Sequence, residues 1–388
     1  MKSILFYIAR YPGYGGIENI TTLLANYFAS KKNYKVSILS CTQQAEEELI
    51  TKLDKYIQFY KLPNNTVSNT EENQKFFNQI IIENSIDTII YQDSYYPNEI
   101  LLLNIINRNQ ITIICVEHTA PDSGIKTMKS ALRATSWYNL YLHAKICYFH
   151  GLGIRKTQKR KQKLYAFCDK YVVLSLGYKS IFLKMNNIED SNKIVAIENP
   201  ISLPILKEMP QKEKVCLFVG RFSSEKGILY LLRIWKKIEE NKDCDEWKLI
   251  MVGDGAKKNE VESFIKKNNL KRIQLEGFKT HVNSYYQKAS IFCMTSIFEG
   301  FPLTLPEAMG NGVVPIAFSS FAASADIIDN NQNGILIPPY NEMMYIQRIT
   351  TLMTQTKERE RLASNALKKS YNFTQELIWE KWNKLLEQ

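Results

Sequence analysis

Short runs of apolar residues alternate with amphipathic stretches along the whole chain. In the first half, such runs predict strands at Ile4–Ile8, Val36–Leu39, Thr88–Tyr91, Thr112–Val116, Tyr171–Leu174 and Ile194–Ile197. In the second half, they predict strands at Val215–Val219, Leu249–Val252, Ile273–Leu275, Ile291–Met294, Val313–Ile316 and Ile335–Ile337. The runs are continuous rather than alternating, which is typical of strands buried on both faces of a parallel sheet.

The stretches between the strands have a helical period. Ile17, Ile20, Leu24 and Phe28, for example, share one face of a helix. Strands that alternate with helices predict doubly wound parallel sheets, in which right-handed crossovers place the loops after the strands along one edge. The predicted fold class is therefore α/β, with two Rossmann-like doubly wound parallel-sheet domains facing each other across a cleft.

A linker divides the chain into these two domains. The segment from Asn199 to Pro210 contains three prolines and has no clear periodicity. We expect an N-terminal domain at residues 1–200 and a C-terminal domain at residues 201–372. Residues 373–388 carry a last helical pattern, which we expect to pack back on the N-terminal domain.

Composition narrows the class of protein. The net charge of +11 favours anionic partners, and 45% hydrophobic residues are ordinary for a chain with full cores. The seven cysteines form no Cys-x-x-Cys pair, so zinc or redox chemistry has little support and a cytoplasmic location is expected. The apolar start Ile4–Ala9 is too short for a signal peptide, and no run approaches the roughly 20 apolar residues that span a bilayer.

One region is strongly basic. Its cations are Arg155, Lys156, Lys159, Arg160, Lys161 and Lys163, and the aromatic residues just before it are Trp137, Tyr138, Tyr141, Tyr148 and Phe149. Basic residues beside aromatic ones suit peripheral contact with an anionic membrane, here the inner face of the cell membrane. A solvated basic helix face explains the same pattern, and the sequence leaves both interpretations open.

The densest chemical signal is the segment that begins at Ser296 and reads SIFEGFPLTLPEAMG. It follows a predicted strand and leads into a helix, with Glu299 in the loop and Glu307 in the helix. Backbone amides at the helix start, together with the helix dipole, would bind an anion such as a diphosphate. Carboxylates nearby can accept hydrogen bonds from paired sugar hydroxyls.

This segment resembles the Glu-x7-Glu motif of retaining, family-4 type GT-B glycosyltransferases (glycosyl transferases group 1). The resemblance implies that Glu299 contacts hydroxyls of the donor sugar and that Glu307 holds the ribose diol of the nucleotide. It also implies that the first domain binds the acceptor and the second domain the nucleotide sugar. Donor contacts are expected along the motif, at Gly300, Phe301, Pro302, Leu303 and Thr304.

Three further loops of the second domain fit the same family. The run VGRFSSEKG resembles its Gly-Arg…Lys-Gly element, in which Gly220 lies beside the donor while Arg221 and Lys226 neutralise the diphosphate as negative charge builds on the leaving group. Gly253 lies in a Gly-Asp-Gly turn that resembles the family's nucleotide-side turn. Gly277 and Phe278 correspond to the loop that contacts the base.

The first domain carries two weaker signals. Gly15 and Gly16 follow the first strand, where family members approach the donor phosphate and the acceptor, although a structural turn would need glycine too. His118 follows the strand Thr112–Val116 and matches a histidine beside the donor sugar in many members. A structural histidine is the alternative, but ligands of such folds bind at this edge.

No metal or cofactor is expected. Asp243 and Asp245 spell Asp-x-Asp, which holds a metal in a different glycosyltransferase fold. Here they fall between a helix and a strand, away from the motif edge, and we interpret them as a surface turn.

The sequence thus predicts a metal-independent enzyme that transfers a hexose or N-acetylhexosamine with retention. The expected donor is a nucleotide sugar, with UDP favoured over GDP, and the expected acceptor is a glycan or a lipid-linked glycan in bacterial surface polysaccharide assembly. One alternative is a GT-B sugar-nucleotide epimerase, which needs no acceptor. The other is a basic nucleic-acid-binding module, for which no recognition motif is present.

Overall fold

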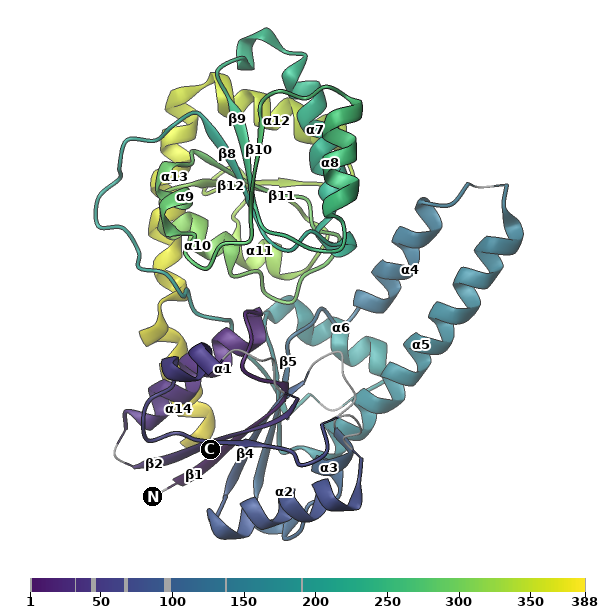
Figure 1. The fold of residues 1–388 in the computed structure, drawn as a ribbon, viewed down its shortest axis with the longest axis vertical. Coiled ribbons are helices and arrows are strands. Elements are labelled where there is room, and N and C mark those ends of the chain that lie inside the picture. The colour runs from purple at the N-terminus through teal and green to yellow at the C-terminus, as the bar shows by residue number, and fades with distance from the viewer. Residues whose placement is uncertain are drawn as a thin grey trace. The chain divides into compact units, whose positions relative to one another are not determined.

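The computed structural model describes residues 2–31, 33–42, 47–65, 69–93, 99–136, 138–189 and 191–387. The chain forms two compact units, each built around one parallel sheet (Figure 1). Unit 1 comprises Met1–Gly124, Cys147–Glu198 and Trp379–Gln388, and unit 2 comprises Ile125–Ile146 and Asn199–Ile378. The main division between Glu198 and Asn199 falls at the start of the proline-containing linker.

Unit 1 contains a seven-stranded sheet in the order β3-β2-β1-β4-β5-β6-β7, with every pair parallel. Its strands are β1 (Lys2–Arg10), β2 (Tyr34–Thr42), β3 (Gln58–Lys61), β4 (Thr88–Asp93), β5 (Thr112–Glu117), β6 (Lys170–Val173) and β7 (Ile194–Ala196). Its helices are α1 (Gly16–Ala29), α2 (Glu71–Glu83), α3 (Glu99–Leu103) and α6 (Leu176–Asn186). All six strands predicted for this half are confirmed.

The edge strand β3 is absent from the sequence prediction. Its pattern is short and mixed, because Gln58 and Lys61 are exposed while Phe59 and Tyr60 are half-buried. A search for continuous apolar runs finds strands covered on both faces, whereas an edge strand has one open side.

Unit 2 contains a six-stranded parallel sheet in the order β10-β9-β8-β11-β12-β13. Its strands are β8 (Val215–Val219), β9 (Lys248–Val252), β10 (Ile273–Gly277), β11 (Ile291–Met294), β12 (Val314–Phe318) and β13 (Ile335–Ile337). Its helices are α7 (Ile228–Glu239), α8 (Lys258–Lys267), α9 (Asn283–Lys288), α10 (Thr304–Gly310), α11 (Ala323–Ile327), α12 (Glu342–Thr354) and α13 (Thr356–Ser370). The predicted strands and the α/β fold class are confirmed here too.

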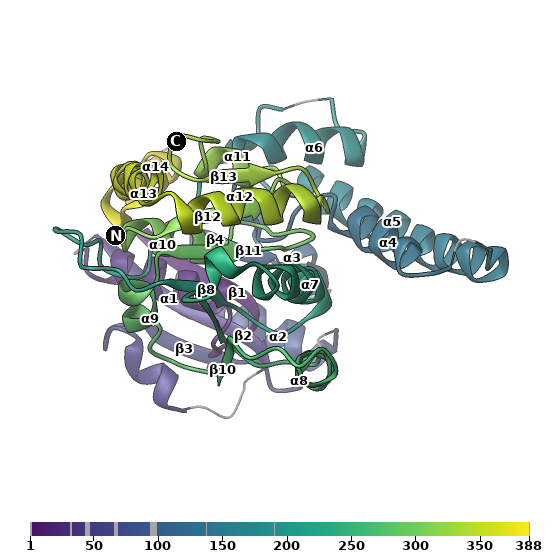
Figure 2. The same ribbon diagram turned by 90° about the horizontal axis from the view of Figure 1, so that it is seen from above.

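Helices cover the sheet of unit 2 and close its core. Helices α7 and α12 lie side by side in both views (Figure 1 and Figure 2), and Arg233 of α7 pairs with Glu342 of α12 at 2.6 Å. The fully buried Trp235 of α7 packs into a core that includes residues of β8, β9, β11 and β12. This packing fixes the strands, and through them the loops at the strand ends.

Three helices cross the division between the units in sequence. They are α4 (Ser123–Arg133), α5 (Leu140–Phe167) and α14 (Gln375–Glu387). Within unit 1, Trp379 of α14 stacks on Tyr27 of α1 with ring centroids 5.3 Å apart, and Lys381 pairs with Glu198. These contacts attach the end of the chain to the first sheet's helix layer.

The strand order places a topological switch point in each sheet. In the first sheet, β2 and β3 lie on one side of β1, and β4 to β7 follow on its other side. In the second sheet, β9 and β10 lie on one side of β8, and β11 to β13 follow on its other side. Open α/β sheets bind ligands at the carboxyl ends of the strands, in the crevice at this point. The loops after β8 and β11 are therefore the first place to look for a site in unit 2.

Candidate donor site

Three loops at the carboxyl edge of the second sheet are tied together by backbone hydrogen bonds. The amide of Gly220, after β8, donates to the carbonyl of Val252 at 3.0 Å. The amide of Gly253, after β9, donates to the carbonyl of Gly277 at 2.8 Å. The predicted donor-binding glycines of these loops thus lie in consecutive turns of one edge.

Close approach of the chains requires glycine at Gly253. Its φ is +147°, and a Cβ atom there would lie 1.9 Å from the carbonyl oxygen of Gly220. No side chain tolerates such a contact, since any larger residue would push the loops after β8 and β9 apart. The Gly-Asp-Gly turn is therefore required by loop packing, whatever it binds.

The loops after β8 and β11 meet across the switch point. Gly227, which ends the short 3-10 turn Ser224–Lys226, has a φ of +62°, and a Cβ atom there would lie 2.1 Å from the carbonyl oxygen of Thr295. The hydroxyl of Thr295 donates to the carbonyl of Gly227 at 3.1 Å, and the amide of Ile297 donates to the carbonyl of Glu225 at 2.7 Å. Both motif loops are therefore held as one unit.

An ion pair joins the two motifs within that unit. The Nζ atom of Lys226 lies 2.7 Å from Oε1 of Glu299, and the hydroxyl of Ser296 donates to the same oxygen at 2.6 Å. The side chain of Glu299 is 12% exposed and that of Lys226 is 21% exposed, so both reach solvent. Residues 73 positions apart in sequence are thus brought together as a preorganised carboxylate and cation.

Arg221 belongs to the same loop and is exposed. Its carbonyl accepts a hydrogen bond from the amide of Ser223 at 2.9 Å, which tightens the turn between β8 and Lys226. An exposed guanidinium beside a preorganised lysine provides positive charge at the switch point. That is the electrostatic requirement for holding a diphosphate.

Helix α10 begins at Thr304, with Leu303 at its N-cap position and no side-chain cap. Phe301 and Pro302 are buried, and the ring of Phe301 packs 5.7 Å from that of Phe373. Gly300 lies before them and is half-buried. Packing of the aromatic ring therefore anchors the loop from Glu299 to the helix start.

Glu307 lies in α10, buried, with both carboxylate oxygens engaged. The hydroxyl of Ser202, from the linker, donates to Oε1, and the hydroxyl of Tyr286, from α9, donates to Oε2 at 3.2 Å. Burial raises the pKa of Glu307, while the two hydrogen bonds oppose that rise. The arrangement already holds two hydroxyl groups, as a ribose diol would present them, and a carboxylate has about four acceptor positions.

The predicted base loop lies at the end of β10. Gly277 has a φ of +70°, with open space where a Cβ atom would stand, and Phe278 is 56% exposed. The hydroxyl of Tyr285 donates to Glu276 at 2.6 Å, which braces the strand just before the loop and lowers the pKa of Glu276. An aromatic ring that is half exposed beside a turn can stack on a flat ligand.

In unit 1, the predicted residues also lie at the carboxyl edge of their sheet. Gly15 is the N-cap residue of α1, and a Cβ atom there would lie 2.1 Å from a carboxylate oxygen of Glu18. Gly16 begins the helix, with open space at its Cβ position. His118 is buried after β5, and its Nε2 atom lies 2.5 Å from the side-chain oxygen of Gln92 at the end of β4.

Next to His118 in sequence, Glu117 forms a buried ionic cluster that was not predicted. Glu117 is 3% exposed and pairs with Lys161 of α5. It also accepts hydrogen bonds from the hydroxyls of Tyr171 at 2.8 Å and Thr119 at 2.7 Å. The strand end that carries His118 is thereby fixed to α5.

The basic region is corrected at two positions. Lys161, expected at a membrane, is buried in the pair with Glu117, and Arg160 pairs with the buried Glu99 at 3.5 Å. Both cations compensate internal carboxylates, so they are not presented to a partner. Arg155, Lys156, Lys159 and Lys163 are exposed. Trp137, named with the aromatic residues, lies outside the described residues.

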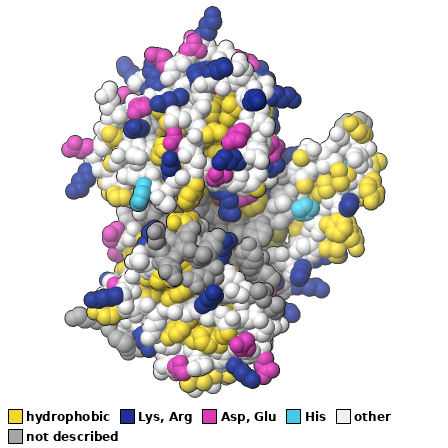
Figure 3. Space-filling view, viewed as in Figure 1, with side chains coloured by type: hydrophobic (Ala, Val, Ile, Leu, Met, Phe, Trp, Pro, Cys, Tyr) yellow, Lys and Arg dark blue, Asp and Glu magenta, His cyan; other side chains and the backbone are white. Residues whose placement is uncertain are grey.

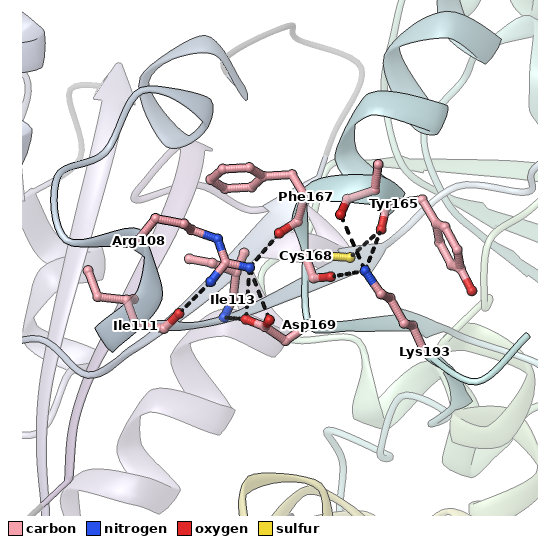
Figure 4. A network of polar contacts seen from close by, with 9 residues as sticks. Arg108, Ile111, Ile113, Tyr165, Phe167, Cys168, Asp169 and Lys193 are labelled. Carbon is pink, nitrogen blue, oxygen red and sulfur yellow. Dashed lines mark hydrogen bonds and ion pairs between the residues drawn. The ribbon is translucent and has the colours of Figure 1, made fainter. Parts of the chain in front are cut away.

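A second polar network lies at the opposite edge of the first sheet (Figure 4). Arg108 pairs with Asp169 at 3.0 Å, and the other oxygen of Asp169 accepts from the amide of Ile113 at 2.7 Å. Lys193 donates to the carbonyl of Cys168 at 2.8 Å. These residues stand at or just before the first residues of β5, β6 and β7, so the network closes the amino edge and is structural.

Sequence reasoning missed Gln92, Glu117, Ser202 and Tyr286. Gln92 and Glu117 stand at strand ends, which was a usable signal. Ser202 and Tyr286 had none, because they reach Glu307 from positions distant in sequence. Asp243 and Asp245 are exposed around a 3-10 turn before β9, as interpreted from the sequence. Among the described residues, no group of three or more His, Cys, Asp or Glu side chains is placed to hold a metal.

The chain is similar in sequence to known glycosyltransferases. Residues 206–369 match the family model of glycosyl transferases group 1. A Haemophilus influenzae protein named as an uncharacterized glycosyltransferase is 25% identical over 397 residues, covering 100% of both chains. A Campylobacter jejuni N-acetylgalactosaminyltransferase, named for an acceptor glycan on diphospho-undecaprenol, is 25% identical over 57% of this chain and 61% of its own.

The fold is shared with solved glycosyltransferase structures. Anabaena HepE, solved with UDP and glucose, aligns over 100% of both chains with a TM-score of 0.75 and 15% sequence identity. The whole chain thus has the fold of GT-B glycosyltransferases, and residues 206–369 match the group 1 family model.

Proposed function

We propose that the enzyme transfers a hexose or N-acetylhexosamine from a nucleotide sugar, with a UDP-sugar favoured, to a glycan or lipid-linked acceptor. The observation that carries the proposal is the ion pair of Lys226 and Glu299, held at the switch point of the second sheet. A carboxylate there can accept hydrogen bonds from sugar hydroxyls, while the adjacent cations face the phosphates.

In this account Arg221 and Lys226 stabilise the departing nucleoside diphosphate, so the reaction needs no metal ion. Glu307 accepts hydrogen bonds from the ribose hydroxyls, by sharing its carboxylate with Ser202 and Tyr286 or by exchanging these partners. Retention of anomeric configuration is part of the proposal and rests on the resemblance of the motif to retaining enzymes.

The name of one relative supports our proposal for the acceptor and the cellular setting. One of them carries a name that specifies an undecaprenyl diphosphate glycan, and we propose a related acceptor in bacterial surface polysaccharide or lipid-linked oligosaccharide assembly. We place the reaction on the cytoplasmic side, where reduced cysteines such as the seven scattered ones of this chain are maintained.

The test is turnover and binding with a panel of nucleotide sugars, with and without acceptor extracts. Arg221→Ala is expected to slow turnover with little change in KM, whereas Glu307→Ala is expected to weaken binding of the free nucleotide in calorimetry. Glu240→Gln, which alters an exposed ion pair on the same domain, is the control. If the enzyme converts the nucleotide sugar into its epimer without any acceptor, the protein is an epimerase and not a transferase.

A further inference from the structure

Helix α5 presents an unusual face to solvent. It has 28 residues, which is about 42 Å of helix, and only Lys161, Leu164 and Tyr165 near its end are buried. Several large side chains before them are exposed: Leu140 at 74%, Tyr141 at 78%, Tyr148 at 64%, Phe149 at 59% and Leu152 at 47%. Figure 3 shows apolar side chains gathered on the surface of the segment that Figure 1 labels α4 and α5.

The exposed residues are ordered along one side of the helix. Steps of three or four residues connect Tyr141, Lys145, Tyr148, Leu152, Lys156, Lys159 and Lys163, all of which are exposed. Such steps keep side chains on one helical face. We call this set the α5 stripe. Its amino-terminal half is mainly apolar and its carboxyl-terminal half is basic.

The opposite side of α5 is anchored in unit 1. Lys161 pairs with the buried Glu117, and Arg160 pairs with Glu99. The side-chain amides of Gln158 and Gln162 donate to the carbonyls of Met185 and Asn186 at 2.7 Å each. The rotation of the helix about its axis is therefore fixed, and the α5 stripe is the side that stays outward.

Charge identifies the occupant of this face. Residues 123–168 contain ten of the chain's 50 Lys and Arg residues and no Asp or Glu. A second copy of the chain would bring two such segments together with no carboxylate between them, which repulsion disfavours. Nucleic acid would match the cations, but it would leave Leu152 and Phe149 in water. An anionic lipid surface matches both halves of the stripe, because its headgroups pair with the cations and the apolar side chains are buried at the boundary of the acyl chains.

We propose that the α5 stripe lies on an anionic lipid membrane, with Tyr141, Tyr148 and Leu152 in the interfacial layer and Lys156, Lys159 and Lys163 on the headgroups. Phe149 flanks the stripe and extends the embedded area. No helix within the described residues is long and apolar enough to cross a bilayer, so the contact is interfacial. The inference goes beyond the proposed chemistry, because membrane contact needs no nucleotide sugar.

Flotation of the full-length protein with vesicles tests the proposal. Vesicles of phosphatidylglycerol and phosphatidylethanolamine are compared with vesicles of phosphatidylcholine at low and physiological salt, in the absence of donor. We expect binding to the anionic vesicles alone, with a partition coefficient that falls as salt rises. The variant Tyr148→Ser/Leu152→Ser should lower the partition coefficient at least tenfold, and Lys156→Glu/Lys159→Glu should do the same.

Matched controls separate this surface from the chain's general positive charge. Lys266→Glu/Lys267→Glu on the exposed face of α8 changes the net charge equally, and Met343→Ser removes an apolar side chain that is 72% exposed. Both controls should float like the unaltered protein, and circular dichroism should show all variants folded. Equal flotation of the stripe variants and the controls overturns the proposal. So does binding to RNA or to an acidic protein without binding to vesicles. Donor hydrolysis, measured separately, tests the proposed function.

Discussion

The amine of Lys226 lies 2.7 Å from the carboxylate of Glu299, and this pair joins the loops that leave the neighbouring strands β8 and β11. The two strands flank the switch point of the second sheet. In the proposed reaction, this pair holds the cation that would meet the diphosphate beside the carboxylate that would meet the sugar. Each residue would position the other before the donor binds.

Removing either partner should therefore reduce turnover rather than folding. For Lys226→Met, we expect kcat to fall by about 100-fold, the usual effect of losing one preorganised donor to developing negative charge. Glu299→Gln should give a similar loss, and the double variant should lose less than the product of the two, since the residues act as a unit. Steady-state kinetics measures this, and multiplicative losses would show that the two residues act independently.

Glu307 should make the stability of the protein depend on pH. Because burial raises the pKa of Glu307, the unfolded chain loses this proton at a lower pH than the folded chain. Between those two values the unfolded state binds fewer protons, so the free energy of unfolding falls as pH rises. Glu307→Gln lacks the ionisable group, so its free energy of unfolding does not have this dependence on pH.

We therefore expect the thermal midpoint of Glu307→Gln, relative to the unaltered protein, to rise as the pH is raised above the ordinary glutamate pKa of 4.5. Differential scanning fluorimetry in a pH series measures the difference. If the thermal midpoint of Glu307→Gln minus that of the unaltered protein stays constant with pH, or increases as the pH is lowered, the result would contradict a buried carboxylate at this position.

The pair of Glu117 and Lys161 should be strongly coupled. Replacement of Lys161 by Met leaves a buried carboxylate without its cation, and such losses cost about 3–5 kcal/mol. Glu117→Gln/Lys161→Met removes both charges and should recover much of that loss. Denaturant unfolding of the single and double variants measures the coupling. Additive losses would mean that the two charges are not paired in solution.

Two glycines provide a matched comparison. Gly253→Ala places a methyl group against the carbonyl oxygen of Gly220, so we expect displaced loops and a loss of stability greater than about 1 kcal/mol. Gly151 lies in the middle of α5 with open space around its Cβ position, so Gly151→Ala should stabilise the helix by up to about 1 kcal/mol. Chemical denaturation and far-ultraviolet circular dichroism measure both effects. A destabilised Gly151→Ala would indicate packing against that face.

Most of the architecture could be predicted because buried parallel strands have a simple signature. Each run such as Ile4–Ile8 or Val215–Val219 is apolar at every position, and the alternation with helices dictates the parallel connection. The edge strand Gln58–Lys61 could not be found in this way. The sequence also gave no sign that helix α5 would be half anchored and half exposed.

The sequence predicted those residues of the candidate site that belong to local motifs. Glu299 and Lys226 each belong to a local motif, and their order along the chain placed both at one sheet edge. Their direct contact was not foreseen, and neither were the partners of Glu307. Ser202 comes from the linker and Tyr286 from another helix, so tertiary packing alone brings these hydroxyls to the carboxylate. Lys161 was assigned to a membrane because linear spacing does not distinguish the anchored side of a helix from its exposed side.

Hydrogen exchange measured by mass spectrometry, with and without UDP, tests the central claim most directly. The account predicts slower exchange on nucleotide addition in two segments, the loop from Gly220 to Gly227 and the segment from Ser296 to Thr304. These are the segments joined by Lys226 and Glu299. Unchanged exchange in both segments, with protection elsewhere in the second domain, would contradict a donor site at this switch point.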